Sequence, residues 1–154
     1  MVLLGQLLDS KGHAVHAIAP GASVIDAIRS MAQNHVGALL VMDGTQLAGI
    51  VSERDYTRKI ALQGRNSRDT RVEEIMTRSV VTVGAKTGTR ACMALMSEKR
   101  IRHLPVVDGD TVLGVVGESE LGSLVASQRH NVALQIAEAT AVADLKAAAE
   151  CVDH

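Results

Sequence analysis

The amino-acid sequence predicts a mixed α/β protein in which one small unit occurs twice, and two observations support this fold class. The chain matches itself without a gap at one constant offset, so that Asp43 matches Asp108 and Gly49 matches Gly114. Within each copy, stretches rich in β-branched residues alternate with stretches that carry apolar residues at helical spacing. Internal duplication of a small strand and helix unit explains both observations.

Each copy is expected to begin with a short strand and a helix. Residues 15–18 and 80–83 are rich in β-branched side chains, which suit strands. In the first copy, Ser23 with Asp26 after it resembles a capping box at the start of a helix. Small and apolar residues then recur at helical spacing, as Val24, Ile28, Met31 and Ala32 in the first copy and as Thr89, Cys92, Met93 and Met96 in the second. Cys92 is therefore expected to be a buried structural thiol.

A hairpin and a second helix are expected to complete each copy. Two apolar runs, residues 38–42 and 47–51, flank the turn residues Asp43 and Gly44, and Asp-Gly favours the positive φ angles of a tight hairpin. A helix follows over residues 52–62. The predicted order is therefore strand, helix, strand, strand, helix, written βαββα, in both copies.

Domain boundaries follow from the repeat. We expect the first unit, with an N-terminal segment, at residues 1–62, a polar linker at 63–71 and the second unit at 72–125. Residues 126–154 no longer match the first copy and are rich in alanine, which predicts one or two additional C-terminal helices.

Composition excludes several classes of function. The 154 residues are 47% hydrophobic, carry a formal net charge of -1 and contain one tyrosine, no tryptophan and no phenylalanine. A nucleic-acid binder needs basic charge and usually aromatic stacking surfaces, so this function is not expected. Cys92 and Cys151 make no metal spacing with the histidines, and lone thiols favour a reducing, cytoplasmic location. No stretch is long enough to span a bilayer, and no signal peptide is expected.

Several motifs resemble those of tandem cystathionine-β-synthase (CBS) domains, over roughly residues 1 to 125. They are Gly-Ile-Val-Ser-Glu-Arg-Asp at 49–55, Ser-Glu-Arg-Asp-Tyr at 52–56, Cys-Met-Ala-Leu-Met at 92–96, and Arg-Ile-Arg-His-Leu-Pro-Val at 100–106 with Val107 and Asp108 after it. The resemblance is closest to stand-alone bacterial CBS pairs. It implies a Bateman module, in which two units pack about a pseudo-twofold axis and leave two clefts between them.

The same resemblance implies a function. Such modules commonly form homodimers and bind adenosyl compounds, including AMP, ADP, ATP, NAD and S-adenosylmethionine, in a regulatory role without catalysis. We therefore expect an energy or redox sensor that binds AMP, ATP or NAD(H) and signals in trans to an unknown protein target. No metal cofactor is expected.

The strongest candidate site begins at Ser52 and Asp55. They lie where a buried strand is expected to pass into a helix, so that backbone N–H groups of the helix start could receive a phosphate. The carboxylate of Asp55 accepts hydrogen bonds only, and the resemblance assigns it to the ribose hydroxyls. Ser52 could donate to phosphate or ribose. A purely structural alternative is an N-cap with an acidic first turn.

The resemblance extends this nucleotide site to further residues. It places the adenine against the first strand of the opposite copy and basic groups near the phosphates. Arginine would make a forked phosphate contact that lysine cannot, and His103 could donate to phosphate or simply pack. The adenine residues are Met76, Thr77, Ser79, Val81 and Ile101, the phosphate residues are Arg54, Lys59, Arg102 and His103, and Arg58 and Arg100 are weaker candidates.

A second, weaker site is expected in the other cleft. Gly117 and Glu120 stand where the first copy has Ser52 and Asp55, so one hydroxyl is missing and the carboxylate is displaced by an extra methylene. The adenine wall there would comprise His13, Val15, His16 and Ile18. A metal site at His13 and His16 is not expected, because no third ligand has suitable spacing.

Two other classes of function were weighed. A structural dimerisation or docking module would keep the fold without a physiological nucleotide, with the C-terminal tail carrying the interaction. An enzyme is not expected, because the sequence has no catalytic triad order, paired carboxylates, glycine-rich phosphate loop or metal cluster.

Overall fold

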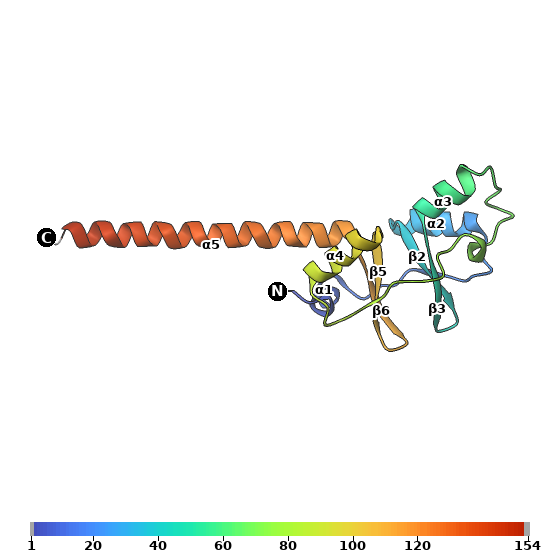
Figure 1. The fold of residues 1–154 in the computed structure, drawn as a ribbon, viewed down its shortest axis with the longest axis horizontal. Helices are drawn as coiled ribbons and strands as arrows, with labels where there is room; N and C mark the ends of the chain where they lie inside the picture. The colour runs from blue at the N-terminus through green and yellow to red at the C-terminus, as the bar shows by residue number, and fades with distance from the viewer. Residues whose placement is uncertain (1, 153–154) are drawn as a thin grey trace. The chain divides into compact units, whose positions relative to one another are not determined.

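The computed structural model describes residues 2–152 of the chain. They form two compact units, one that ends at Gly117 and one that begins at Glu118 (Figure 1). The first unit contains both sheets and the second consists of helix α5. The predicted mixed α/β class is confirmed.

The first copy of the repeat contains the predicted series of elements, with an extra helix before it. Its elements are α1 (Leu4–Lys11), β1 (Ala17–Ile18), α2 (Val24–Asn34), β2 (Ala38–Asp43), β3 (Gln46–Ser52) and α3 (Glu53–Tyr56). A π-helical segment, η1 (Thr57–Ala61), continues α3, and a 3-10 turn, η2 (Val72–Glu74), follows the linker. The helix expected over residues 52–62 is thus an α-turn that widens into a π-turn.

The second copy repeats the series. It comprises β4 (Val83–Gly84), α4 (Thr89–Lys99), β5 (His103–Asp108) and β6 (Thr111–Gly117), and it is followed by α5 (Glu118–Val152). The first strand of each copy is shorter than predicted, because only two residues of β1 pair with β2 and only two of β4 pair with β5. The β-branched residues favour an extended chain, but a strand also needs a neighbouring strand to pair with, and local propensity does not show how far that pairing extends.

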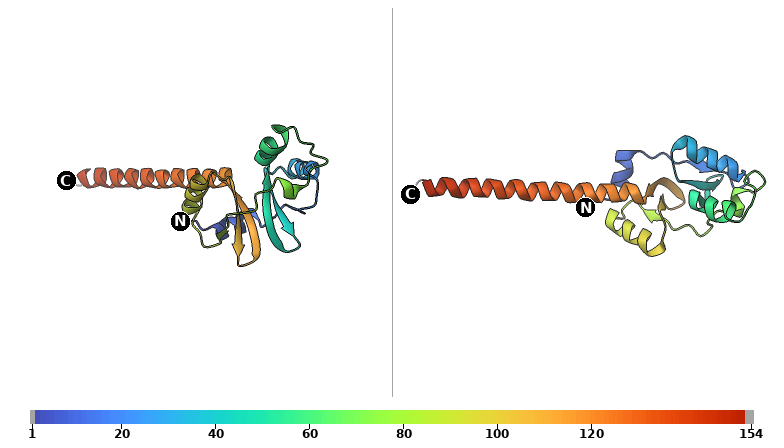
Figure 2. Two further views of the ribbon diagram at one scale, coloured as in Figure 1. Left: turned by 45° about the vertical axis from the view of Figure 1, so that its right-hand side comes forward. Right: turned by 90° about the horizontal axis from the view of Figure 1, so that it is seen from above.

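Each copy forms its own three-stranded sheet, in the orders β1-β2-β3 and β4-β5-β6. The first strand runs parallel to the second, and the second and third form an antiparallel hairpin. Leu40 pairs with Ile50, and Pro105 with Val115, so the two registers correspond. Gly44 and Gly109 have φ angles of 61° and 58°, which explains the Asp-Gly turns. Figure 2 shows the hairpins of the two copies side by side.

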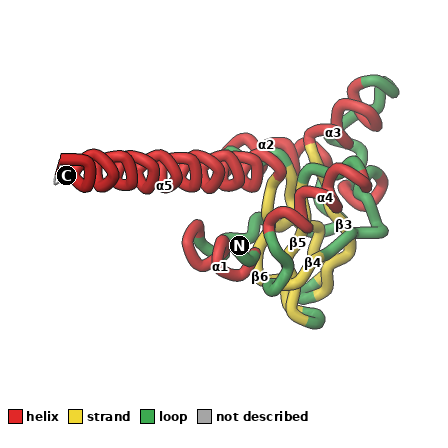
Figure 3. Tube along the Cα trace, turned by 60° about the vertical axis from the view of Figure 1, so that its left-hand side comes forward, coloured by secondary structure: helices red, strands yellow, loops and turns green. Residues whose placement is uncertain are grey.

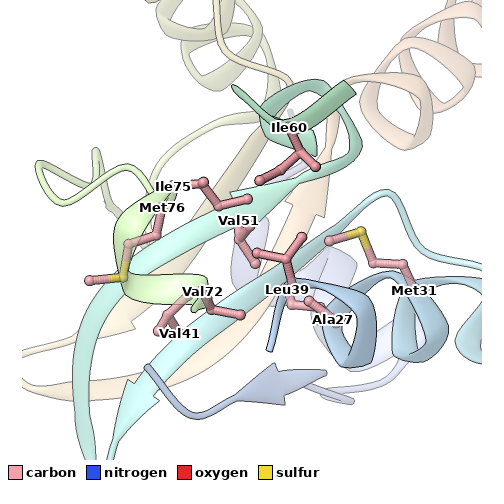
Figure 4. Packing of buried hydrophobic residues seen from close by; sticks show 10 residues of the cluster. Ala27, Met31, Leu39, Val41, Val51, Ile60, Val72, Ile75 and Met76 are labelled. Atoms are coloured by element: carbon pink, nitrogen blue, oxygen red, sulfur yellow. The ribbon is translucent and has the colours of Figure 1, made fainter. Parts of the chain in front are cut away.

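An aliphatic core lies between the first sheet and the helices around it (Figure 4). The sheet contributes Leu39, Val41 and Val51, helix α2 contributes Ala27 and Met31, and all five are almost fully buried. The core set is completed by Val24, Ile60, Val72, Ile75 and Met76. The linker after η1 leads the chain back to this sheet, where Val72, Ile75 and Met76 complete the core of the first copy.

Helix α5 runs without a break over 35 residues, where the sequence left one or two helices open (Figure 3). It begins at Glu118, where a helix was expected to complete the second copy, and it continues into the expected tail at 126–154. Leu134, Ile136 and Val142 are large apolar side chains with exposed fractions of 48%, 62% and 63%. The sequence predicts an apolar face of this tail that includes Val132 and Leu145 and a charged face that includes Asp144 and Glu150. The side chains of these four residues lie outside the described part. No helix within residues 2–152 is long and apolar enough to cross a membrane.

Candidate functional site

A groove of about 380 Å³ lies in the unit that ends at Gly117, and both copies of the repeat line it. This volume is within the usual range for small-molecule sites, about 300–1,000 Å³. The structure brings ten predicted residues together there, namely Ser52, Arg54, Asp55, Lys59, Thr77, Ser79, Val81, Ile101, Arg102 and His103. The weaker candidates Arg58 and Arg100 also line the groove.

Ser52 and Asp55 occupy the junction of β3 and α3. Ser52 is the N-cap of α3, and its extended backbone, with φ −131° and ψ 166°, lets its side chain turn back over the helix start. Oδ2 of Asp55 accepts from the Ser52 backbone N at 2.9 Å and from Ser52 Oγ at 3.1 Å. The capping box expected as the structural alternative is therefore present, and it lies on the wall of the groove.

Lys59 holds the other oxygen of the same carboxylate. Its Nζ lies 3.1 Å from Asp55 Oδ1 and donates to the Ile75 carbonyl oxygen at 2.7 Å. The Asp55 side chain is 13% exposed, so the pair is only partly screened by water. A carboxylate has about four acceptor positions, and three donors already use this one. One hydroxyl of a ribose diol could donate to the remaining acceptor position on Oδ1. The other hydroxyl could donate to Oδ2 only if Ser52 Oγ gave up its own hydrogen bond there.

Two of the helix-start N–H groups that the sequence suggested as phosphate donors are already bonded. The Glu53 N–H donates to the Gly37 carbonyl at 3.0 Å, and the Asp55 N–H donates to Ser52 Oγ at 3.3 Å. Neighbouring chain and the cap itself satisfy these donors, which a local sequence pattern cannot reveal. Side-chain cations would therefore have to replace these two donors at a phosphate in the groove.

The segment that enters the second copy forms the opposite wall. Thr77 and Ile50 exchange two backbone hydrogen bonds, at 3.0 and 2.9 Å, so Thr77 adds to the edge of β3. The chain approaches closely there because Gly49 has no side chain: a Cβ at this position would lie 2.7 Å from Met76 Sδ and 2.8 Å from the Thr77 carbonyl oxygen. Ser79 and Val81 then continue along the groove.

Met76 is the one predicted residue of this site that the structure does not bring into the groove. Its side chain is 7% exposed and belongs to the core of the first copy (Figure 4). Met76 turns into the core, whereas Thr77, the next residue, is exposed and lines the groove. The placement depends on the contact with Gly49, which joins residues far apart in the sequence.

Basic side chains converge on the groove from both copies. Arg54 Nη1 donates to the Arg100 carbonyl oxygen at 3.4 Å. Arg100 ends α4 in the left-handed conformation, with φ 55°, and His35 does the same after α2, with φ 54°. The shared conformation is therefore a property of the repeated unit, and in the second copy it brings Arg100 to the groove.

Four lining residues were not predicted from the sequence: Gly37, Ile50, Glu53 and Val80. A Cβ at Gly37 would be in ordinary van der Waals contact with the His103 ring, at 3.7 Å. The repeat contained a signal for this residue, because Gly37 occupies the position of Arg102 in the other copy. Ile50, Glu53 and Val80 are neighbours in sequence of predicted residues.

The residues of the second predicted site divide between the two units. His16 lies just before β1, Ile18 in β1 and Gly117 at the end of β6, whereas Glu120 belongs to α5. That site stays a prediction from the sequence.

His13 and Lys11 contact the edge of β6. The His13 ring nitrogens lie 2.9 Å from the Leu113 carbonyl oxygen and 2.9 Å from Asp9 Oδ1, and Lys11 Nζ donates to the Val115 carbonyl oxygen at 2.7 Å. The hydrogen bonds to Asp9 and to Leu113 raise the pKa of His13 above its ordinary value. Among the described residues, no group of His, Cys, Asp or Glu could hold a metal ion.

Cys92 is fully buried on α4, and this burial raises the pKa of its thiol. Both observations agree with the structural role expected for it. Cys151 has a side chain outside the described part of the chain.

Comparison with known proteins identifies the repeated unit. The family model described as CBS domain matches residues 12–62 and 72–126. The mitochondrial CBS domain-containing protein CBSX3 of Arabidopsis thaliana is 44% identical over 113 residues, which are 70% of this chain and 53% of the relative. The chain thus spans about half the length of that relative.

Solved structures show the same fold. A putative signal-transduction protein with CBS domains from Burkholderia ambifaria MC40-6 is 45% identical, with a TM-score of 0.79, and the match covers 82% of this chain and 95% of that chain. A CBS domain pair solved in complex with 5′-methylthioadenosine and S-adenosyl-L-methionine is 24% identical, with a TM-score of 0.74, and the match covers 83% and 98% of the two chains.

Proposed function

Because this chain belongs to the family of CBS-domain proteins, we propose that it is a regulatory sensor of an adenine nucleotide of the AMP, ATP or NAD(H) type. One observation carries the proposal: a single groove is lined by the Ser52 and Asp55 junction of one copy and by residues 77–81 and 100–103 of the other. A nucleotide in this groove would contact both copies at once, so its binding free energy would depend on how the copies are arranged and could shift that equilibrium.

The proposed pose follows from the chemistry of the walls. The ribose would lie at Asp55 and Ser52, the adenine along Thr77, Ser79 and Val81, and the phosphates among the basic groups. Hydrogen bonds to a charged group contribute about 1.5–3 kcal/mol each. One such bond, to the remaining acceptor position on Asp55 Oδ1, would supply part of the roughly 8 kcal/mol that a micromolar ligand requires. A second bond at Asp55 would have to replace the one from Ser52 Oγ. The adenosyl ligands of the CBS pair described above are consistent with this class of compound.

The proposal also includes the biological setting. The chain would act without catalysis, as a cytoplasmic homodimer, and would signal in trans to a protein target. A regulatory role is supported by the signal-transduction description of the Burkholderia structure.

Isothermal titration calorimetry with AMP, ATP and NADH tests the nucleotide site. Asp55→Ala should lower affinity at least tenfold, about 1.4 kcal/mol. Asp55→Asn keeps an acceptor for the Ser52 N–H and so separates loss of the ribose contact from loss of the cap. Asp26→Ala is the matched control. Asp26 follows the N-cap Ser23 of α2 by three residues, as Asp55 follows Ser52, but it does not line the groove. Unchanged affinity in both Asp55 variants would refute the ribose role.

A structural docking module is the second candidate function. It is favoured by the exposed apolar residues of α5, Leu134, Ile136 and Val142. Under this alternative none of the three nucleotides would raise the melting temperature, whereas a ligand at one hundred times its Kd stabilises the folded state by about 2.7 kcal/mol.

A further inference from the structure

The groove carries an excess of positive charge. Two carboxylates line it, Glu53 and Asp55, against five basic side chains, Arg54, Arg58, Lys59, Arg100 and Arg102. Lys59 and Asp55 neutralise each other at 3.1 Å. Arg54, Arg58 and Arg100 then outnumber the one remaining carboxylate of the lining, Glu53, in a chain whose formal net charge is -1.

These guanidinium groups come from both copies of the repeat. Arg54 and Arg58 belong to α3 and η1, whereas Arg100 and Arg102 lie between α4 and the start of β5. The hydrogen bond from Arg54 Nη1 to the Arg100 carbonyl, at 3.4 Å, shows that the two sets meet. Like charges that line one groove repel each other, and a polyanion between them would replace that repulsion with forked contacts on both sides.

Exposed arginines are usually solvated surface groups, but two features distinguish these. They line one groove instead of being spread over a face. The backbone donors of Glu53 and Asp55 are already bonded to Gly37 and Ser52, so they do not supply the positive field for a phosphate. The arginine side chains supply it.

We infer that the groove selects its adenosyl ligand by charge: it takes a compound with a diphosphate or longer phosphate chain that bridges the two copies, and it rejects the sulfonium compound S-adenosylmethionine. Arg58 and Arg100 are the specificity-determining residues. This inference rests on the proposed nucleotide site and adds the phosphate requirement to it.

Calorimetry with four compounds at about 50 and 300 mM salt tests the inference, using ADP, AMP, adenosine and S-adenosylmethionine. ADP should bind at least about tenfold more tightly than adenosine, with AMP between them, and S-adenosylmethionine should bind more weakly than adenosine. Added salt should weaken ADP binding much more than adenosine binding, because it screens the ionic contacts.

Two variants separate charge selection from adenosyl binding. Arg58→Gln and Arg100→Gln should each lower ADP affinity about tenfold and leave adenosine affinity within about twofold. Arg90→Gln is the control, because it removes the same charge from an exposed residue of α4 outside the groove lining. Melting temperatures of all variants verify that they are folded.

The outcomes distinguish this inference from the proposed function. If S-adenosylmethionine binds as tightly as ADP, or if both groove variants behave like Arg90→Gln, charge selection is refuted while nucleoside binding stands. If none of the four compounds binds to the wild-type chain, the proposed function and this inference both fail.

Discussion

Gly49 is the position where one added methyl group should disturb both the fold and the groove. A Cβ at Gly49 would lie 2.7 Å from Met76 Sδ, 3.0 Å from Met76 Cγ and 2.8 Å from the Thr77 carbonyl oxygen. Met76 is 7% exposed and has little room to move, and the Thr77 carbonyl accepts the Ile50 N–H at 3.0 Å. Relief of the clash must therefore shift core packing, backbone hydrogen bonding or both.

The cost follows from these two contacts. Overpacking a well-filled core costs about 1–3 kcal/mol, and one weakened backbone hydrogen bond adds about 1 kcal/mol. Gly49→Ala should therefore lower the free energy of unfolding by about 2–4 kcal/mol. At Gly114, the equivalent position, the atoms nearest to an added Cβ belong to the Leu8 side chain, at 2.7 and 3.0 Å. Leu8 is also fully buried, but no backbone hydrogen bond is part of this close contact, so Gly114→Ala should cost less.

Urea denaturation followed by circular dichroism measures these differences. Gly84→Ala, in β4, is the control because its added Cβ would have no neighbour within 4 Å, and its stability should stay within about 1 kcal/mol of wild type. Gly49→Ala should also weaken nucleotide binding, since Thr77 lines the groove. The reasoning is refuted if Gly49→Ala is no less stable than Gly84→Ala.

Three further predictions concern single side chains. His13→Gln should lower the melting temperature more at about pH 5.5 than at about pH 8.5. The pKa of His13 is raised in the folded state, so its stabilisation is complete below the ordinary histidine pKa and disappears as pH rises through the folded-state pKa. An equal effect at both pH values would contradict this. Ser23→Ala removes the acceptor for the Asp26 N–H and should cost about 1 kcal/mol in urea denaturation, whereas Ser67→Ala, in the linker, should cost less. Lys59→Met removes the contacts to Asp55 and Ile75. Since the Lys59 side chain is 40% exposed, the free energy of unfolding should fall by only about 1 kcal/mol in urea denaturation. No change in stability would mean that these contacts contribute nothing.

Much of the fold could be predicted because its signals are local. The Asp-Gly turns, the Ser23 cap and the apolar spacing of α2 and α4 each depend on residues within one or two turns of the chain. Strand length was less predictable, since β1 and β4 each pair over only two residues although β2 and β5 continue beyond them. The π-turn of η1 was not predicted, because apolar spacing does not separate it from a regular helix.

Most residues of the groove were predicted, because the repeat and its motifs marked them. Individual groups differ from their predicted roles where segments far away in the sequence contact them. Met76 went into the core because Gly49 leaves space for it, and the helix-start donors were bonded by Gly37 and by the Ser52 side chain. Arg58 and Arg100 were weak candidates from sequence, and the structure makes both of them part of the groove wall.

The sequence by itself determined the duplication, the order of elements in each copy and the cap formed by Ser52 and Asp55, because each depends on neighbours along the chain. Only the tertiary structure decided which side of residues 76–81 faces the groove and that arginines from the two copies converge. Those outcomes depend on the pairing of Thr77 with Ile50 and on the close approach at Gly49, contacts between segments far apart in the sequence.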